Sequence, residues 1–235
     1  MAYPERFDGR KTDEMRPIEA KAGVIKNADG SAWFKIGKTE AYAAVYGPRN
    51  LHPRFLQNPK RGLLRCYYNM LPFSGSGNRI RPGGNRRSKE ISMVTMKALD
   101  PVLDLTAFPN AVVDVFIEFP QTDAGSRCAG ISAAAMALAD AGIPMREMVA
   151  SVAVGRVDDK ILADLDYSEE AYDGPVADIP MAVTTNTKEI TLLQMDGEIS
   201  SEDLRTALNL GIKISEQIHK VQREALLERF KEGSQ

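Results

Sequence analysis

The sequence predicts an α+β fold in which sheets pack against a few long helices. Short apolar segments separated by turn residues fill most of the chain and indicate strands. Two stretches, at about 127–141 and about 200–232, have the apolar content and spacing of helices. The 235 residues contain no internal repeat and no linker, so we expect a single domain over residues 1–235.

The chain is expected to begin with an antiparallel meander. Its three strands are RPIEAKAGVI, SAWFKIG and TEAYAAVYG, with a turn at residues 27–30 after the first and Gly47-Pro48 closing the third. A polar loop, HPRFLQNPKRG, leads to a further strand, LLRCYYNML. Neighbouring side chains of a strand point to opposite faces, so we expect either Tyr67 or Tyr68 to face the core and the other to face away.

The next segment, PFSGSGNRIRPGGNRR, is too polar to pack and longer than a simple connection requires, so it is either disordered or functional. From Ser88 the apolar spacing fits a helix despite Pro101, and AVVDVFIEFP is typical of a buried strand. The alanine-rich helix follows and ends at Gly142, with Pro144 beyond. Its small side chains predict close packing against a sheet.

The C-terminal part is expected to supply four strands and one long helix. The strands are VASVAVGRV, KILADL, ADIPMAVTT and EITLLQM. Ser200 and Asp203 resemble a capping box at the start of the helix. The apolar stripe of this helix consists of Leu204, Leu208, Gly211, Ile214, Ile218, Val221 and Ala225.

The overall composition argues against membrane, secreted and metal-cluster proteins. Hydrophobic residues make up 43% of the chain, and no window approaches the roughly 18 apolar residues of a membrane span. The charged N-terminus has no apolar signal region, so we expect a cytoplasmic protein without membrane contact. Cys66 and Cys128 lack metal or redox spacing and are expected to be buried free thiols.

Charge is distributed unevenly along the chain. The net charge is −2, yet residues 41–89 contain no Asp or Glu. The cations of this run are Arg49, Arg54, Lys60, Arg61, Arg65, Arg79, Arg81, Arg86, Arg87 and Lys89. Such a run is either a solvated basic face or a surface for a polyanion, and its length favours the polyanion.

A phosphate site is predicted where the alanine-rich helix begins. Gly125, Ser126 and Arg127 follow a strand directly, so free backbone N–H groups and the positive end of the helix dipole meet there. Ser126 can donate a hydrogen bond and Arg127 a charged, bidentate one. The alternative is a plain helix start, with Ser126 as the capping residue and Arg127 exposed.

Two further groups of basic residues fit an RNA chain. Arg86 and Arg87 end the basic loop, where they can grip phosphates or simply be solvated. His52 and Arg54 stand beside Phe55, which offers stacking next to charge, as single-stranded RNA binding needs.

The third constellation is acidic. Asp178 interrupts an apolar strand, and a carboxylate there needs a partner or a purpose. The carboxylates that crowd before it can bind Mg²⁺, act as a general acid, or form an acidic surface loop. They are Asp164, Asp166, Glu169, Glu170 and Asp173. Together, the three constellations predict phosphoryl transfer with phosphate as the acceptor.

Several motifs give the chain a family resemblance over nearly its whole length. They are FDGRKTDEMRPIEAKAGVIKNADGSAWFKIGKTEAYAAVYGP, YYNMLPFS, NRRSKEIS, QTDAGSRCAGISAAAMALADAGIPM and ADIPMAV. The chain resembles the RNase PH family and, within it, the catalytic ring subunit of the archaeal exosome. The resemblance implies the RNase PH fold, which is ribosomal-protein-S5-domain-2-like. It also implies a hetero-hexameric ring with a related inactive RNase PH-like subunit, and RNA-binding cap proteins.

Carried over to this sequence, the resemblance assigns a role to each constellation. Phosphate, the co-substrate, falls on Gly125, Ser126 and Arg127, and the arginine pair that holds RNA is Arg86 and Arg87. The loop with His52 and Arg54 resembles the neck through which RNA enters the ring.

The acidic residues match the family's pattern only in part. The family's strand aspartate is Asp178, but its second aspartate would fall on Tyr172. A one-residue shift makes Asp173 the second catalytic carboxylate, and Asp178 with Asp173 would then hold a divalent metal, Mg²⁺. Relatives that have lost catalysis carry a Gly-Pro near this point, and this chain has Gly174-Pro175 at the same place.

The predicted activity is a phosphate-dependent 3′-to-5′ exoribonuclease that releases nucleoside diphosphates from single-stranded RNA and can run in reverse as RNA tailing. Two alternatives remain at this stage. One is a non-catalytic ring subunit that threads RNA, and the other is a homo-hexamer that trims tRNA.

Overall fold

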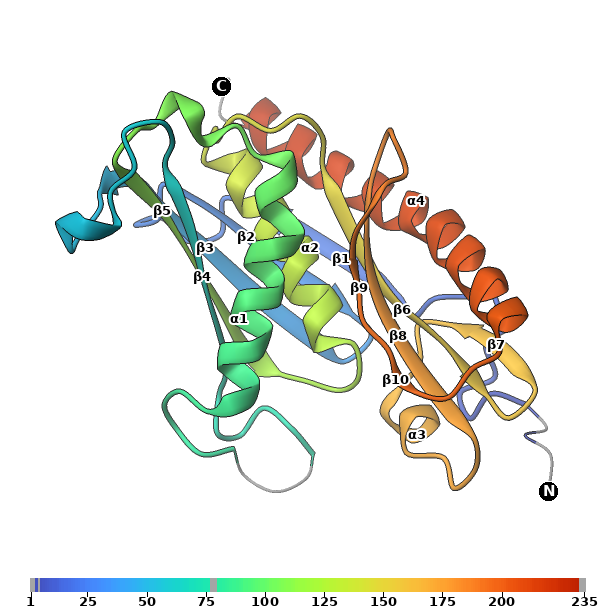
Figure 1. The fold of residues 1–235 in the computed structure, drawn as a ribbon. Coiled ribbons are helices and arrows are strands. Elements are labelled where there is room, and N and C mark those ends of the chain that lie inside the picture. Colours follow the sequence, from blue (N-terminus) through green and yellow to red (C-terminus); the bar gives the residue numbers. More distant parts are fainter. Residues whose placement is uncertain (1–2, 4, 77–79, 233–235) are drawn as a thin grey trace.

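The computed structural model describes residues 3, 5–76 and 80–232 and contains two five-stranded sheets (Figure 1). The first has the order β1-β2-β3-β5-β4. Its strands are β1 (Ile18–Ala22), β2 (Gly30–Ile36), β3 (Thr39–Asn50), β4 (Leu63–Met70) and β5 (Ala111–Gln121). The strands β1 to β3 form the predicted antiparallel meander, and β4 runs parallel to β5. Parallel neighbours require a crossover, and the helix α1 (Arg86–Leu99) lies within it.

The second sheet is antiparallel and has the order β10-β8-β6-β7, with β9 pairing with β8. Its strands are β6 (Val149–Val157), β7 (Lys160–Ala163), β8 (Val176–Thr184), β9 (Ile190–Leu193) and β10 (Asp196–Gly197). The short β10 places Asp196 directly opposite Asp178 of β8.

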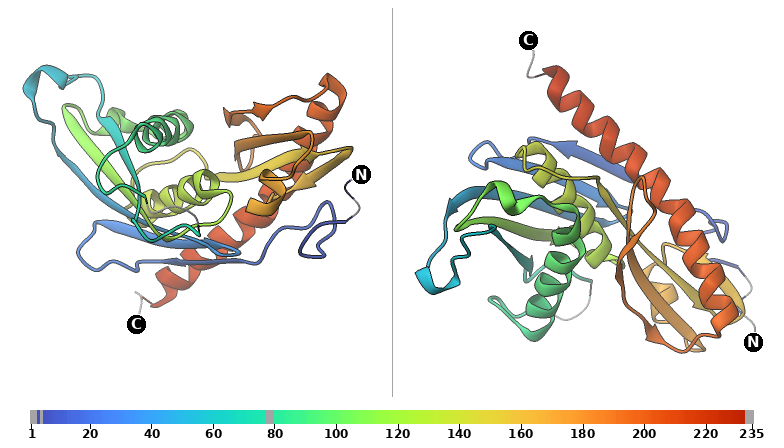
Figure 2. Two further views of the ribbon diagram at one scale, coloured as in Figure 1. Left: turned by 90° about the horizontal axis from the view of Figure 1, so that it is seen from below. Right: turned by 45° about the horizontal axis from the view of Figure 1, so that its top comes forward.

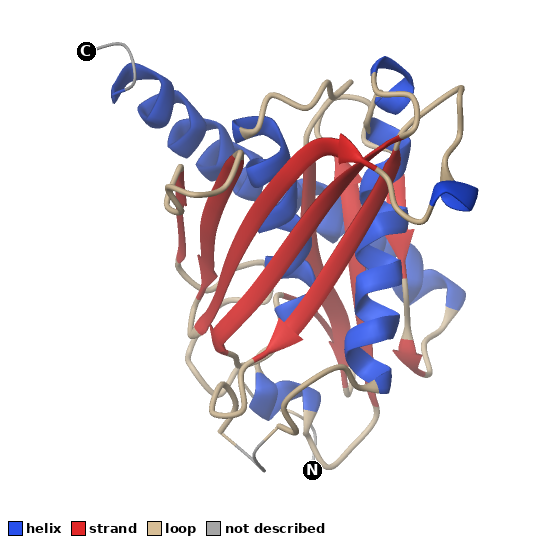
Figure 3. Cartoon of the chain, turned by 90° about the vertical axis from the view of Figure 1, so that its left-hand side faces the viewer, coloured by secondary structure: helices blue, strands red, loops and turns tan. Residues whose placement is uncertain are grey.

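The helix α2 (Ser126–Asp140) lies between the sheets and packs against strands of both (Figure 2). The long helix α4 (Ser201–Glu232) crosses the second sheet and reaches β1, while α1 packs on β4 beside β9. Figure 3 looks onto the outer face of the first sheet, with α2 behind it. The predicted α+β arrangement of sheets and long helices is therefore confirmed.

Small side chains allow α2 to fit between the sheets. Nearly every residue from Cys128 to Leu138 is buried, as the alanine-rich composition predicts. At Gly30 of β2, an added Cβ would lie 2.2 Å from the backbone nitrogen of Ala141, so only glycine permits this approach. One hydrophobic cluster includes residues of both sheets and of α2.

Several local predictions are confirmed. Tyr68 is buried and Tyr67 exposed, and both cysteines are buried free thiols. The Oγ atom of Ser200 accepts a hydrogen bond from the Asp203 amide at the start of α4. In the described part of the chain, no helix combines the length and apolar character that a membrane crossing requires.

One boundary differs from the sequence predictions. The strand β3 does not end at Gly47-Pro48 but continues to Asn50, because a bulge between Tyr46 and Arg49 restores its pairing with β5. Three cations of the acid-free run pair with carboxylates from other segments, as Arg61 does with Asp100. Arg79 of that run lies outside the described residues.

Candidate active site

The start of α2 has the geometry of an anion site. Gly125 is the N-cap residue, and its φ of 70° is a left-handed conformation that favours glycine. No side chain caps the helix. The first backbone amide that donates within the helix is that of Ala129, and its acceptor is the carbonyl oxygen of Gly125. The amides before Ala129 in the first turn are thus available to a bound anion.

Ser126 is the first helical residue and not the cap, so the alternative of a plain serine-capped helix does not describe this site. Its Oγ accepts a hydrogen bond of 2.8 Å from the hydroxyl of Tyr68 on β4. Burial raises the pKa of Tyr68, so its hydroxyl stays protonated and keeps donating. This contact from β4 orients the Ser126 hydroxyl.

A pocket of about 270 Å³ joins the start of α2 to the second sheet. Its lining contains the predicted Gly125, Ser126, Arg127, Arg87 and Asp178. Its other residues are Asp123, Ala124, Cys128, Ala153, Glu170, Pro180, Gln194, Met195 and Asp196. Residues as far apart in the sequence as Arg87 and Asp196 thus share one polar pocket.

Arginines line one side of this pocket. Arg127 is partly buried, and its Nη2 lies 3.7 Å from Oε1 of Glu90, a long and weak contact. Its Nε is buried and has no hydrogen-bond partner among the described residues. Arg87 lines both this pocket and a neighbouring one of about 630 Å³, whereas Arg86 lines only the neighbour. Arg127 and Arg87 are therefore the two cations among the described residues that line the pocket at the anion site.

Asp178 stands opposite the arginines on β8. Its Oδ1 is buried without a hydrogen-bond partner in the described part of the chain. Burial raises the pKa of Asp178 to about 6; the negative charge of Asp196 adds to this rise and Arg127 opposes it. A carboxyl group with this pKa can carry a proton near neutral pH and deliver it to a leaving oxygen.

Another carboxylate in the pocket is Glu170, which the sequence did not single out. It ends the short helix α3 (Tyr167–Glu170). Burial, followed by the negative charge of Asp178, raises the pKa of Glu170 to about 7. Asp173, in contrast, is exposed and lines none of the described pockets. The one signal for Glu170 was the Asp166/Glu169 spacing, which forms a capping box here and fixes the helical turn that holds Glu170.

Two other members of the acidic group serve a structural purpose instead of lining a surface loop. Glu169 is fully buried and receives two 2.7 Å hydrogen bonds from Arg6. Asp164 is 2% exposed and pairs with Arg16. Sequence reasoning missed both partners, because they lie about 150 residues earlier in the chain.

Carboxylates that could hold a metal are few. No group of three or more His, Cys, Asp or Glu side chains with metal-binding placement occurs among residues 3, 5–76 and 80–232. Asp178 and Glu170 share a side pocket with Asp196, and Asp178 has an unpaired oxygen there. Mg²⁺ commonly takes only one or two protein carboxylates and completes its shell with water and substrate phosphate, so this donor set fits Mg²⁺.

His52 and Arg54 are not brought to this pocket. Both are exposed in the loop that follows β3, where Leu51 bonds to Asn110 just before β5 begins. The pocket lies beyond the other end of β5, so a whole strand separates the loop from the pocket (Figure 1).

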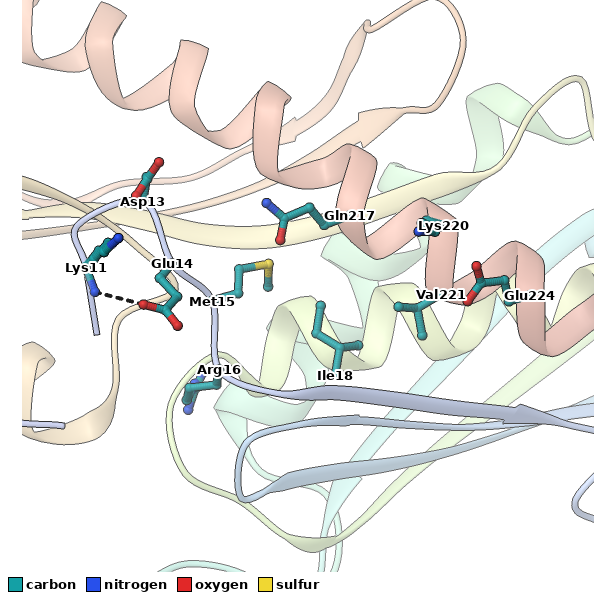
Figure 4. Close-up of a pocket in the computed structure, with 10 residues that line it drawn as sticks. All are labelled: Lys11, Asp13, Glu14, Met15, Arg16, Ile18, Gln217, Lys220, Val221 and Glu224. Carbon is teal, nitrogen blue, oxygen red and sulfur yellow. Dashed lines mark hydrogen bonds between the residues drawn. The ribbon is translucent and has the colours of Figure 1, made fainter. Parts of the chain in front are cut away.

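A larger hollow than this pocket is an open groove of about 800 Å³ between α4 and the segment before β1 (Figure 4). Its charged residues are Lys11, Asp13, Glu14, Arg16, Lys220 and Glu224. Three cations and three carboxylates cancel, so this groove has no preference for an anionic substrate.

The fold and this pocket define a class of protein, and the chain belongs to it: the 3′ exoribonuclease family, known as RNase PH. The family's domain 1 matches residues 14–144 and its domain 2 matches residues 147–214. The predicted family and its RNase PH fold are confirmed. The predicted single domain over residues 1–235 stays a prediction.

Particular relatives narrow the comparison. The chain is 50% identical to exosome complex component Rrp41 of Thermococcus kodakarensis over 96% of its own length and 90% of the relative. It is 51% identical to the Pyrococcus furiosus protein of that name, over 96% and 89% of the two chains. The corresponding values for Methanopyrus kandleri Rrp41 are 49%, 96% and 93%.

Solved structures support the same fold. Rice Rrp46 superposes with a TM-score of 0.82 at 24% identity, covering 94% of this chain and all of that one. A chain of the Archaeoglobus fulgidus exosome with RNA bound to the active site superposes with a TM-score of 0.78 at 23% identity, covering 92% of each chain.

Proposed function

We propose that the chain is the catalytic subunit of an exosome ring and a phosphate-dependent 3′-to-5′ exoribonuclease. It would shorten single-stranded RNA from the 3′ end and release nucleoside diphosphates. The activity agrees with the family and with relatives that are about 50% identical. One observation carries the proposal: an uncapped helix start with Ser126 and Arg127 faces Asp178 across a single pocket.

In this mechanism, inorganic phosphate is held by the first amides of α2, Ser126 and Arg127. A phosphate oxygen attacks the last phosphodiester, so a new P–O bond forms and the bond to the 3′ oxygen of the preceding nucleotide breaks. The 3′ oxygen takes a proton, and Asp178 is the group placed to deliver it. Arg87 and Arg86 would hold the phosphates of the RNA end. The new P–O–P linkage of the product keeps much of the energy of the broken phosphodiester, so the reaction is reversible.

Glu170 is proposed as the second carboxylate, because it lines the pocket and shares the charge environment of Asp178. This assignment takes the role that the sequence gave to Asp173. A bound Mg²⁺ would be held by Asp178 and Glu170 as charged carboxylates, and the metal would then take the place of the proton of Asp178. Its contribution would be to neutralise negative charge on the leaving oxygen and the phosphates.

The ring and its partners belong to the same proposal. By analogy with the exosome relatives, the chain would alternate with a related inactive RNase PH-like subunit, receive RNA through a neck that includes His52 and Arg54, and carry RNA-binding cap proteins. A cytoplasmic location stays part of this proposal.

The test is to incubate the chain, assembled with its ring partner, with 5′-labelled single-stranded RNA with and without phosphate. We expect shortening only with phosphate, and nucleoside diphosphates as products. Asp178→Asn should lower kcat by about 1,000-fold, within the range for loss of a general acid, and leave RNA binding unchanged. The matched control is Asp159→Asn, an exposed aspartate in the turn after β6.

Other outcomes point elsewhere. An inactive ring that still binds RNA would identify a threading subunit. Shortening that is indifferent to phosphate would exclude phosphorolysis. A homo-hexamer active without any partner, detected by its mass, would contradict the hetero-ring.

A further inference from the structure

The two sides of the pocket belong to different sheets, and something must hold them in register. The phosphate-binding segment, residues 123–127, joins β5 of the first sheet to α2. The acidic segment, residues 164–170, follows β7 of the second sheet and ends with Glu170. Reactions of this kind lose about 100-fold in rate when groups are misplaced by roughly 1 Å.

One buried side chain contacts both segments. We propose that Arg16 is a positioning residue that fixes the phosphate-binding segment and the acidic segment relative to each other. This inference rests on the proposed function of the pocket. Arg16 lies just before β1 and is 6% exposed, and Figure 4 shows it at the side of the large groove that faces away from α4.

On the acidic side, Arg16 makes three bonds to the carboxylate of Asp164. Its backbone nitrogen and Nε lie 2.9 Å and 2.8 Å from Oδ2, and its Nη2 lies 2.6 Å from Oδ1. Asp164 has a φ of 52°, a left-handed conformation that aspartate adopts more readily than most residues, and its amide donates to the carbonyl of Ala153 on β6. Two residues later Asp166 caps α3, which ends with Glu170. A shift of Asp164 would therefore also move Glu170.

On the phosphate side, the same guanidinium reaches the segment before the helix. Its Nη2 lies 3.3 Å from the carbonyl oxygen of Ala124, and its Nη1 lies 3.7 Å from Oδ2 of Asp123. A Cβ added to Gly125 would lie 3.3 Å from Arg16 Nη2 and 4.0 Å from Asp164 Oδ1. The cap residue of the anion site, the arginine and the aspartate therefore meet at one point.

The pair is also built to stay charged and fixed. Burial disfavours the charged form of Arg16, but the hydrogen bonds and charge of Asp164 outweigh it and raise the pKa of Arg16. A Cβ added to Gly37, in the turn between β2 and β3, would lie 2.7 Å from Arg16 Cδ, so the side chain is enclosed along its stem as well.

Arg6 provides the matched control. It is 5% exposed and makes two 2.7 Å bonds to Glu169, so it resembles Arg16 in burial and pairing. It also donates hydrogen bonds to the carbonyl oxygens of Lys11, Glu14, Ala163 and Asp164. Arg6 thus bonds to the acidic segment and to the chain before β1 but makes no contact of this kind with the phosphate-binding segment, whereas Arg16 contacts both sides of the pocket.

The test compares Arg16→Lys with Arg6→Lys in the assembled ring. Lysine keeps the charge but cannot span both segments, because it presents one nitrogen where arginine presents a fork. We expect Arg16→Lys to lower kcat by about 100-fold and to raise the KM for phosphate, with unchanged RNA affinity. Arg6→Lys should lower kcat without changing the KM for phosphate. An equal KM for phosphate in the two variants would overturn the proposal.

Amide hydrogen exchange gives a readout that does not need activity. In Arg16→Lys, residues 122–128 and 164–170 should both exchange faster, whereas in Arg6→Lys only 164–170 should. Faster exchange in one segment alone in Arg16→Lys would contradict the inference even if the wild-type ring proved inactive.

A further experiment uses the wild-type chain, so it does not depend on whether a variant folds. Addition of inorganic phosphate should slow exchange in both segments, because Arg16 transmits the ordering of one to the other. Slowing confined to residues 122–128 would refute the coupling. No slowing in either segment would refute the phosphate site of the proposed function, and the variant pattern would then decide the role of Arg16.

Discussion

The phosphate side of the pocket is continuous in the sequence, whereas its carboxylates come from three separate places in the chain. Gly125, Ser126 and Arg127 are adjacent and gain their geometry from a strand that leads into a helix. Asp178, Glu170 and Asp196 meet only because β8, α3 and β10 pack together. The phosphate side depends mainly on local backbone structure, and the acidic side depends on tertiary structure.

After the loss expected for Asp178→Asn, the largest expected effect tests which carboxylate works with Asp178. Glu170→Gln should lower kcat by about 100-fold or more, since it removes a proton-transfer or metal-holding group. Asp173→Asn should leave kcat within about twofold, because exposed substitutions rarely matter. Single-turnover rates with saturating phosphate and RNA measure the cleavage step that these variants are expected to change. The reverse ranking would restore Asp173 as the catalytic residue.

The next effect concerns the cation of the phosphate side. Arg127→Gln removes a charge-assisted hydrogen bond of about 1.5–3 kcal/mol and should raise the KM for phosphate roughly 10- to 100-fold. Arg65→Gln is the control, because Arg65 pairs with Asp114 on the outer face of the first sheet. Initial rates over a phosphate titration distinguish the two variants. A rise in the KM for RNA alone would assign Arg127 to the RNA chain.

A smaller effect on the KM for phosphate is expected at Tyr68, which contacts Ser126. Tyr68→Phe removes the hydroxyl that donates to Ser126, and loss of about 1 kcal/mol should raise the KM for phosphate about fivefold. Tyr67→Phe, one residue away on the exposed face, removes the same atom and should change nothing. Equal effects in the two variants would mean that Tyr68 does not act through Ser126.

The smallest effect is on stability and follows from the raised pKa of Asp178, about 6 against an ordinary 3.8. A carboxyl group whose pKa is raised on folding favours the folded chain below about pH 4, and this contribution is lost as pH rises through 6. Asp178→Asn should therefore gain stability relative to wild type between pH 4 and pH 8. The expected gain is on the order of 1–2 kcal/mol, or about 2–4 °C per kcal/mol in Tm.

Thermal unfolding in a chelating buffer without phosphate measures this gain, because bound metal would stabilise the charged carboxylate. The gain should be near zero at pH 4. A gain of the same size at pH 4 and pH 8 would show that folding does not raise the pKa of Asp178.

The comparison also explains how far the sequence could be interpreted. Strand alternation, an alanine-rich helix and Gly125 before it are local signals, and they predicted most elements and the anion site. The pairing of Arg16 with Asp164 joins residues 148 positions apart and leaves no periodic pattern. Glu170 was missed for the same reason: its role depends on where α3 lies, and a four-residue helix is too short to stand out.

The composition of α2 has a consequence for how this chain can change over time. Because the helix separates the two sheets, the width of its side chains sets the spacing of the phosphate side from the acidic side. At Gly130, an added Cβ would lie 3.1 Å from Phe119, so even one methyl group presses on the first sheet. Residues far from any reacting atom, such as Ala133 and Ala135, are therefore subject to a limit on volume. Enlargement there would widen the gap across which a phosphate must be gripped and a proton delivered.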